Sequence, residues 1–230
     1  MSAPEQLVLQ LPFRAALGRD DFLVGESNAA AVKLIDDWPN WPSHVTCLVG
    51  ADGSGKSHLA SVWQMKASAR VVSLQDINVE KIPALLETGA LCLEYHQGHI
   101  FDEHAVFHAF NIARQSNGYI LFTSRLAPHA WQVKLPDLAS RLNAVPVVDI
   151  AAPDDALLRG VLVKLFNDRQ ISVDEPLVDY MLSRMPRSLA AARQLVAEID
   201  RLAMVEKAEI TRPFVGRVLA GFENLDLFSP

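Results

Sequence analysis

The sequence contains little of what several protein classes require. It has only two cysteines, Cys47 and Cys92, and each lies within an apolar run, so we expect buried thiols in a reducing compartment rather than disulfides or metal ligands. No run approaches the roughly 18 apolar residues that a membrane span needs, and the N-terminus lacks the basic start of a secretory signal. These absences predict a cytoplasmic protein without a membrane segment.

Positive charge is also scarce. The 21 lysines and arginines are outnumbered by 27 aspartates and glutamates, which gives a formal net charge of -6. Strong affinity for nucleic acid depends on clustered basic side chains that release counterions from phosphates. A protein whose main task is to grip DNA is therefore not expected. The four tryptophans are expected in the core and at its rim, because no basic stripe accompanies them.

Short apolar runs alternate with longer amphipathic stretches up to residue 152. This alternation is typical of βα units around a largely parallel sheet. It predicts an α/β fold with a five-stranded, mainly parallel sheet. The expected strands cover residues 44–49, 70–73, 90–94, 119–123 and 145–150, and expected helices between them cover 56–67 and 103–116.

The strand pattern then stops, and the rest of the sequence indicates helices. Asp154 or Asp155 can cap the first helix, Pro176 lies near the first turn of the second, and Thr211 can cap the last. A helix from about residue 187 to 205 lies between them. We therefore expect three parts, with bounds at residues 1–18 for a tail, 19–152 for the α/β subdomain and 153–230 for a helical lid subdomain.

A complete phosphate-binding motif lies between an expected strand and an expected helix. Residues 50–57, GADGSGKS, match the pattern G-x-x-x-x-G-K-S/T, whose glycines let consecutive backbone N–H groups point at phosphate oxygens. Lys56 is expected to reach the β- and γ-phosphates and Ser57 to hold Mg²⁺. The motif predicts a site for ADP or ATP, and its other expected contacts are Gly50, Gly53, Ser54, Gly55 and His58.

Further motifs follow in order along the chain and resemble the AAA+ domain of the DnaA/Hda family of bacterial replication proteins. DFLVGESN at residues 21–28 precedes the phosphate-binding motif. LFTS at 121–124 resembles the family's sensor 1 strand, and LPDLASRL at 135–142 resembles the box that carries its arginine finger. The resemblance covers nearly the whole chain. It is strongest to the short Hda-type members, which lack a DNA-binding domain, because the helical stretch is the last one and the first residues carry QLVLQL.

The resemblance implies roles for residues around the nucleotide. Phe22, Val24 and Gly25 match the segment that lines the adenine pocket, although core packing is an equally good explanation. Ala190 falls at the position of the family's sensor 2 arginine. Arg187 and Arg193, three residues to either side, are the candidates to replace it, and we expect them on one helix face.

Three residues are expected to act in hydrolysis. Arg141 matches the arginine finger, which acts on nucleotide bound to a neighbouring molecule; the alternative is a surface arginine paired with Asp137 or Asp149. Ser124 could contact the γ-phosphate or an attacking water, or be a hydrogen-bonded hydroxyl at a strand end. Glu94 ends an apolar run where such proteins place the acidic residue that holds Mg²⁺ through water.

One position departs from the family pattern. A second acidic residue normally follows the first, but Tyr95 follows Glu94 here. A tyrosine cannot serve as the carboxylate that polarises the attacking water. Slow intrinsic hydrolysis is therefore expected.

The N-terminal tail contains a candidate partner motif. Gln6, Leu7, Leu9 and Leu11 resemble the peptide by which partners bind the DNA polymerase sliding clamp, and the alternative is an edge strand or a disordered tail. Residues 224–228, NLDLF, have similar apolar spacing but lack the glutamine.

As a whole, the resemblance implies a negative regulator of replication initiation. Such a protein binds adenine nucleotide and the clamp, contacts DNA only indirectly through the clamp, and promotes hydrolysis of ATP bound to DnaA. Self-association is left open. Two alternatives stand beside this interpretation: a self-sufficient P-loop ATPase, and a DnaA-like adaptor or loader for which nucleotide is a structural ligand.

Overall fold

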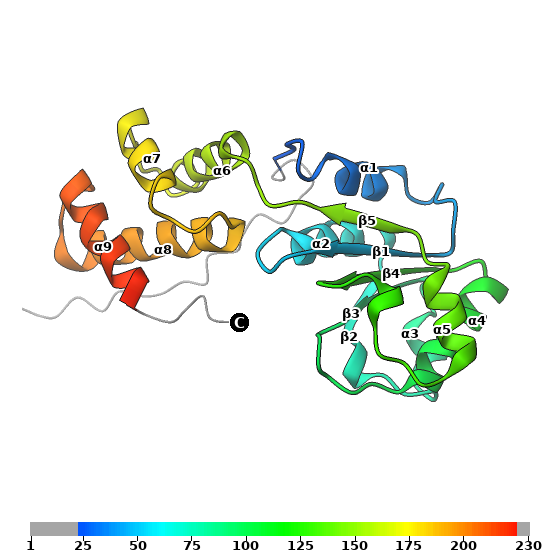
Figure 1. The fold of residues 1–230 in the computed structure, drawn as a ribbon. Coiled ribbons are helices and arrows are strands. Elements are labelled where there is room, and N and C mark those ends of the chain that lie inside the picture. Colours follow the sequence, from blue (N-terminus) through cyan, green and yellow to red (C-terminus); the bar gives the residue numbers. More distant parts are fainter. Residues whose placement is uncertain (1–22, 225–230) are drawn as a thin grey trace, which may run out of the picture.

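The structure is a computed structural model that describes residues 23–224, with side chains described up to residue 221. It has two parts that lie side by side, an α/β subdomain and a helical lid subdomain, joined by the link after the last strand (Figure 1). The candidate clamp peptide, Phe22 and residues 225–228 lie outside the described residues. No helix in the described part is both long and apolar enough to cross a membrane.

A parallel sheet forms the centre of the α/β subdomain, and the prediction of a five-stranded α/β fold is confirmed. The strand order is β2-β3-β4-β1-β5. The last strand begins two residues later than expected, because Pro146 has no N–H to donate to a neighbouring strand. The strands are β1 (Val45–Gly50), β2 (Arg70–Ser73), β3 (Ala90–Glu94), β4 (Tyr119–Ser124) and β5 (Val147–Ile150).

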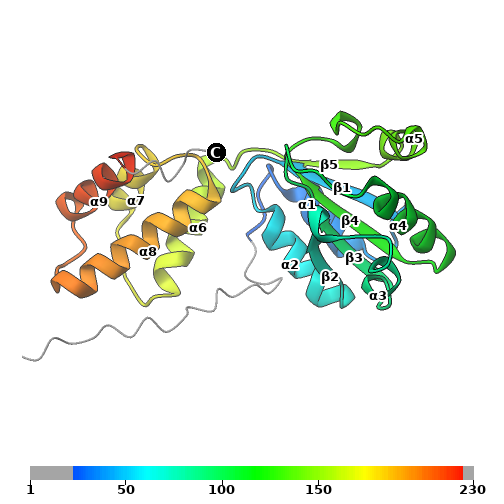
Figure 2. The ribbon, with the colours of Figure 1, turned by 90° about the horizontal axis from the view of Figure 1, so that it is seen from below.

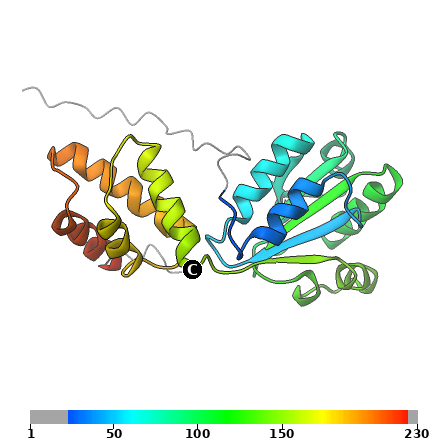
Figure 3. The same ribbon diagram turned by 90° about the horizontal axis from the view of Figure 1, so that it is seen from above.

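Helices cover both faces of this sheet. On one face lie α1 (Ala29–Asp37) and α2 (Lys56–Ala67), side by side in Figure 3. On the other lie α3 (Ile82–Leu85), α4 (Glu103–Gln115) and α5 (Pro136–Asn143). Successive residues of β1 face opposite ways, so Cys47 packs with the α4 side and Leu48 with the α2 side. Both cysteines are buried in strands, as expected.

The lid subdomain has a hydrophobic core of its own. Its helices are α6 (Asp155–Asn167), α7 (Glu175–Leu182), α8 (Leu189–Glu206) and α9 (Arg212–Asn224), and the long α8 packs along α6 (Figure 2). The predicted helical lid is confirmed. Side-chain caps begin all four of these helices, because each cap accepts a hydrogen bond from the backbone N–H three residues later. The caps are Asp154, Asp174, Ser188 and, at 3.5 Å, the expected Thr211.

Candidate functional site

The phosphate-binding motif folds into a tight loop between β1 and α2. Gly53 and Gly55 have φ angles of 73° and 107°, in the left-handed region that favours glycine. Gly50 is crowded, since an added Cβ would lie 2.7 Å from the Oγ of Ser54 and 2.9 Å from the carbonyl oxygen of Ile150. The glycines therefore let the loop curl, and Ser54 packs against its start.

Lys56 folds back over this loop. Its Nζ donates hydrogen bonds to the carbonyl oxygens of Gly50 (2.7 Å) and Ala51 (2.8 Å). Burial lowers the pKa of Lys56, and the nearby Arg125 lowers it further, whereas Asp52 and Glu94 act in the opposite direction. An anion bound beside this ammonium group would favour its charged form.

The loop residues fit a nucleotide phosphate with its Mg²⁺. The Oγ of Ser54 is buried and has no hydrogen-bond partner among the described residues, so a polar ligand at the loop would satisfy it. Ser57 is exposed in the first turn of α2, where the N-terminal end of a helix favours negative charge. Lys56 would neutralise part of the phosphate charge.

The sheet places an acidic residue and two hydroxyls beside this loop. Glu94, the last residue of β3, pairs in register with Thr123 of β4, and Ser124 pairs with Val49, which directly precedes the loop. Thr123 and Ser124 are buried. The Oγ of Ser124 accepts a hydrogen bond from the N–H of Leu126 at 3.0 Å, so it already has a structural role; its contact with a phosphate stays a prediction.

An ion pair that the sequence did not predict links the loop to the residue after β4. Arg125 Nη1 lies 3.1 Å from a carboxylate oxygen of Asp52, and both side chains are largely exposed. Asp52 occupies a variable position of the phosphate-binding pattern, and Arg125 directly follows LFTS. Neither position belongs to a sequence pattern that would have predicted this ion pair.

Residues 23–28, part of which the resemblance assigns to the adenine pocket, form a compact turn beside the lid. Asn28 is 1% exposed; its side-chain oxygen accepts from the N–H of Gly25 (2.9 Å) and its Nδ2 donates to the carbonyl of Leu23 (3.0 Å). Gly25 lies against the lid, since an added Cβ would be 3.2 Å from the Cβ of Leu157. Val24 is 52% exposed, so its apolar side chain is available to a ligand.

The first turn of α8 lies directly against the phosphate-binding loop. The N–H of Leu189 donates to the carbonyl oxygen of Gly53 at 3.1 Å. An added Cβ on Gly53 would lie 2.2 Å from the Oγ of Ser188 and 3.0 Å from the Cβ of Ala190. Ala190, the residue at the sensor 2 position, therefore faces the loop.

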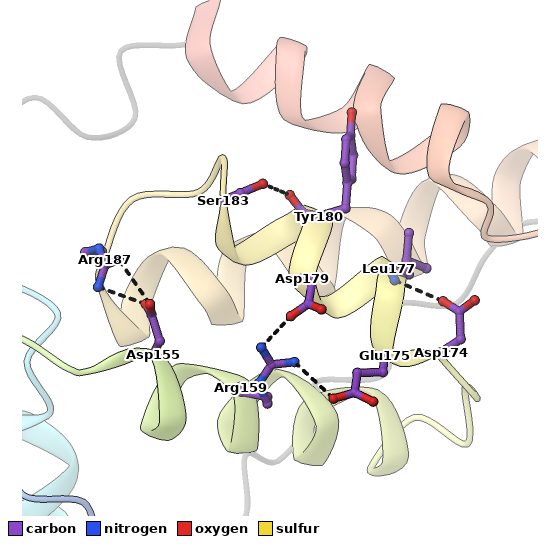
Figure 4. Close-up of polar contacts among 9 residues, drawn as sticks. All are labelled: Asp155, Arg159, Asp174, Glu175, Leu177, Asp179, Tyr180, Ser183 and Arg187. Atoms are coloured by element: carbon purple, nitrogen blue, oxygen red, sulfur yellow. Dashed lines mark hydrogen bonds and ion pairs between the residues drawn. The ribbon is translucent and has the colours of Figure 1, made fainter.

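The two candidate sensor 2 arginines lie in different surroundings. A guanidinium nitrogen of Arg193 is 3.0 Å from Nδ1 of His58, the third residue of α2, and burial lowers the pKa of Arg193. Arg187 precedes Ser188, the N-cap of α8, and pairs with Asp155 at 2.8 Å and 3.2 Å (Figure 4). The expectation that both arginines share one helix face is wrong, because α8 begins at Leu189.

Tyr95 is part of an aromatic cluster next to the site. Its ring stacks on Trp131, with centroids 4.2 Å apart and planes at 20°, and meets the edge of Phe101. Burial raises the pKa of Tyr95, which favours the neutral phenol. The position that carries an acid in the resembled family is thus occupied by a packed aromatic ring. A cleft of about 530 Å³ lies beside it, between the loops that follow β3 and β4.

Arg141 lies on α5, across the sheet from α2 (Figure 1). Its guanidinium carbon is 4.0 Å from the centroid of the Phe107 ring of α4. Within the described residues it forms no ion pair with Asp137 or Asp149. The finger role stays a prediction, and between residues 23 and 221 no carboxylate forms an ion pair with the stacked guanidinium.

Three comparisons place the chain among known proteins. Residues 155–219 match a family model described as "Hda, lid domain". The chromosomal replication initiator protein DnaA of Leifsonia xyli subsp. xyli is 21% identical over 232 residues, which cover 90% of this chain and 49% of that protein. This chain therefore spans about half the length of that curated relative.

Solved structures show the same fold. Domain III of the replication initiation protein DnaA from Thermotoga maritima superposes with a TM-score of 0.73 at 18% identity, covering 93% of this chain and 98% of that one. AMPPCP-bound DnaA from Aquifex aeolicus gives 0.66 at 19% identity and covers 90% and 70%. This chain is therefore similar in sequence to DnaA, matches the Hda lid model over residues 155–219, and has the fold of DnaA domain III.

Proposed function

We propose that this chain is a cytoplasmic, nucleotide-binding negative regulator of replication initiation, which binds the sliding clamp and promotes hydrolysis of ATP bound to DnaA. The observation that carries the proposal is the placement of Arg141. Its guanidinium stacks on Phe107 and has no carboxylate partner in the described part of the chain, and its helix, α5, lies on the opposite face of the sheet from α2. Such a group suits a site on another molecule.

The chain's own nucleotide site supports binding better than turnover. Lys56 would hold the phosphates of ADP or ATP, and Ser57 and Glu94 would hold Mg²⁺, which neutralises phosphate charge when it is bound. Tyr95 stacks on Trp131 at the position of the expected second acid, so no carboxylate there polarises a water. This arrangement argues against the self-sufficient ATPase.

In the proposed action, Arg141 completes a site on DnaA. A positioned guanidinium stabilises charge that develops on the transferring phosphate, and such fingers contribute about 10³- to 10⁵-fold in rate. The clamp would be bound through Gln6, Leu7, Leu9 and Leu11. The clamp would then bring the protein to DNA without a basic surface of its own.

Single-turnover hydrolysis of labelled ATP on DnaA, with clamp-loaded DNA present, tests the proposal. Wild type should accelerate hydrolysis, and Arg141→Ala should abolish most of the acceleration while still binding nucleotide. Arg141→Lys should rescue little, because a point charge cannot replace the planar fork. Arg114→Ala, which removes an exposed arginine from the end of α4, is the matched control.

The outcomes separate the alternatives. Full stimulation by Arg141→Ala would exclude the finger role. A wild type that binds DnaA and never stimulates would favour the adaptor, and turnover of the isolated protein at about one per second or faster would favour the ATPase. Retention on immobilised clamp, compared between wild type and a Gln6→Ala/Leu9→Ala variant, tests the clamp contact separately.

A further inference from the structure

Two lid arginines differ from the others in their partners. Most described lid arginines pair with a carboxylate, and Figure 4 shows two of these pairs, Arg159 with Asp179 and Arg187 with Asp155. Arg184 and Arg212 have no carboxylate partner among the described residues. The remaining pairs are Arg169 with Asp200, Arg201 with Glu198 and Arg217 with Glu206, while Arg193 contacts His58.

Both of these arginines lie on one aromatic ring. The guanidinium carbon of Arg184 is 4.1 Å from the centroid of Tyr180, and that of Arg212 is 4.6 Å from it. Tyr180 stands on α7 and points toward α9 (Figure 4), where its hydroxyl lies close to Gly216. Both arginine side chains are exposed. Tyr180 thus holds two neighbouring guanidinium groups at the surface.

This arrangement is electrostatically unfavourable without a ligand. Two like charges contact the same ring, and Arg212 is also the first residue of α9, where the helix dipole disfavours a cation. The missing carboxylate partners do not reflect a shortage of acidic residues, since the chain has 27 acidic and only 21 basic residues. A cation–π contact at an exposed position offsets only part of the repulsion.

We propose that Arg184, Tyr180 and Arg212 form a binding site for an acidic segment of a partner protein. Each guanidinium can bind a carboxylate through two parallel hydrogen bonds, so the pair fits two neighbouring aspartates or glutamates. Nucleic acid is a poorer fit, because most other described lid cations are paired with carboxylates, which leaves few free positive charges for phosphates. This site does not depend on the proposed action on DnaA.

Fluorescence anisotropy of the full chain with a labelled oligoglutamate peptide tests the site at low salt. Arg184→Gln and Arg212→Gln should each weaken binding about fivefold, near the upper end for exposed ion pairs. Arg217→Gln is the matched control, since it removes a charge from the same helix that is already paired with Glu206. Tyr180→Phe should bind like wild type, because the ring face remains.

Three results would overturn the proposal. Wild type could fail to bind the peptide, or Arg217→Gln could weaken binding as much as the other two substitutions, which would indicate a diffuse field. Labelled oligo(dT) could bind more tightly than the peptide and depend on the same arginines, which would make the ligand a nucleic acid. Unchanged thermal melting of the glutamine variants shows that any loss comes from the site.

Discussion

The α/β subdomain and the lid differ in where their polar side chains lie. All buried polar residues of the described chain belong to the α/β subdomain, and four of them, Ser54, His58, Thr123 and Ser124, lie around the phosphate-binding loop. The lid core is apolar, and most of the described lid arginines lie in ion pairs outside that core. Burial of polar groups is unfavourable unless they are bonded. The difference indicates that the buried polar groups of the phosphate-binding site come from the α/β subdomain, and that the lid contributes contacts to this site.

These contacts are few. Leu189 bonds Gly53, Arg193 bonds His58, and Leu157 packs on Gly25. Each subdomain has a core of its own, so either could unfold first. The predictions below test how far the two subdomains are separate.

Removal of a large core side chain should have the largest effect. Phe166→Ala in the lid and Phe122→Ala in β4 each empty a fully buried position, and each should cost about 3–5 kcal/mol. Tryptophan fluorescence reports only the α/β subdomain, whereas circular dichroism reports both. The tryptophans are Trp38, Trp41, Trp63 and Trp131.

In urea, Phe166→Ala should therefore shift the dichroism transition to lower concentration than the fluorescence transition. Phe122→Ala should shift the fluorescence transition instead. Coincident transitions in both variants would show that the two subdomains unfold as one cooperative unit and do not differ in stability.

Gly53→Ala should have the next largest effect, because it disturbs the contact between the subdomains. Gly89→Ala is the matched control: Gly89 has a φ of 79°, close to the 73° of Gly53, but nothing lies within 4 Å of an added Cβ. The strain of a left-handed alanine costs about 1 kcal/mol in both variants. The clash with Ser188 should add about 2 kcal/mol at Gly53 only.

Urea denaturation measures both variants, and the nucleotide-induced rise in Tm measures the site. Gly53→Ala should lose that rise and Gly89→Ala should keep it. If both substitutions lowered the free energy of unfolding equally, the lid would be able to move away from the loop at no cost in stability.

The contact between Arg193 and His58 should have the smallest effect. In a double-mutant cycle, Arg193→Gln and His58→Gln should show a coupling energy of about 1 kcal/mol, typical of residues in contact. Arg201→Gln, further along α8, should show no coupling with His58→Gln. Zero coupling for Arg193 would leave the backbone contact at Gly53 as the main polar link between the subdomains.

Much of the fold could be predicted because its signals are local. The bounds of α2, β2 and β3 follow from the phosphate-binding motif and from apolar runs with clear ends. Three helices were missed: α1 has no side-chain cap, α3 is a single turn, and α5 begins at Pro136 inside a motif that was interpreted only for function. A missing cap explains the first case and shortness the second, whereas the start signal of α5, a proline in its first turn, was overlooked.

The site could be predicted where its residues are neighbours in the sequence. Lys56 and the glycines of the loop form one motif, and the pattern alone located them. The contact of Gly53 with Ser188 and the stacking of Tyr95 on Trp131 join residues far apart in the chain. No periodicity or spacing marks such pairs, because they form only when distant segments of the chain are packed together.

The contact between Gly53 and the lid has a consequence for sequence variation. The phosphate-binding pattern leaves position 53 open to any residue, yet here Ser188 Oγ and Ala190 Cβ fill the space that a side chain would need. In relatives with the same lid placement, a side chain at position 53 should therefore appear only together with a smaller residue at 188 or 190, or with a displaced start of α8. Positions 53, 188 and 190 should covary as a set, although two of the three lie outside the motif.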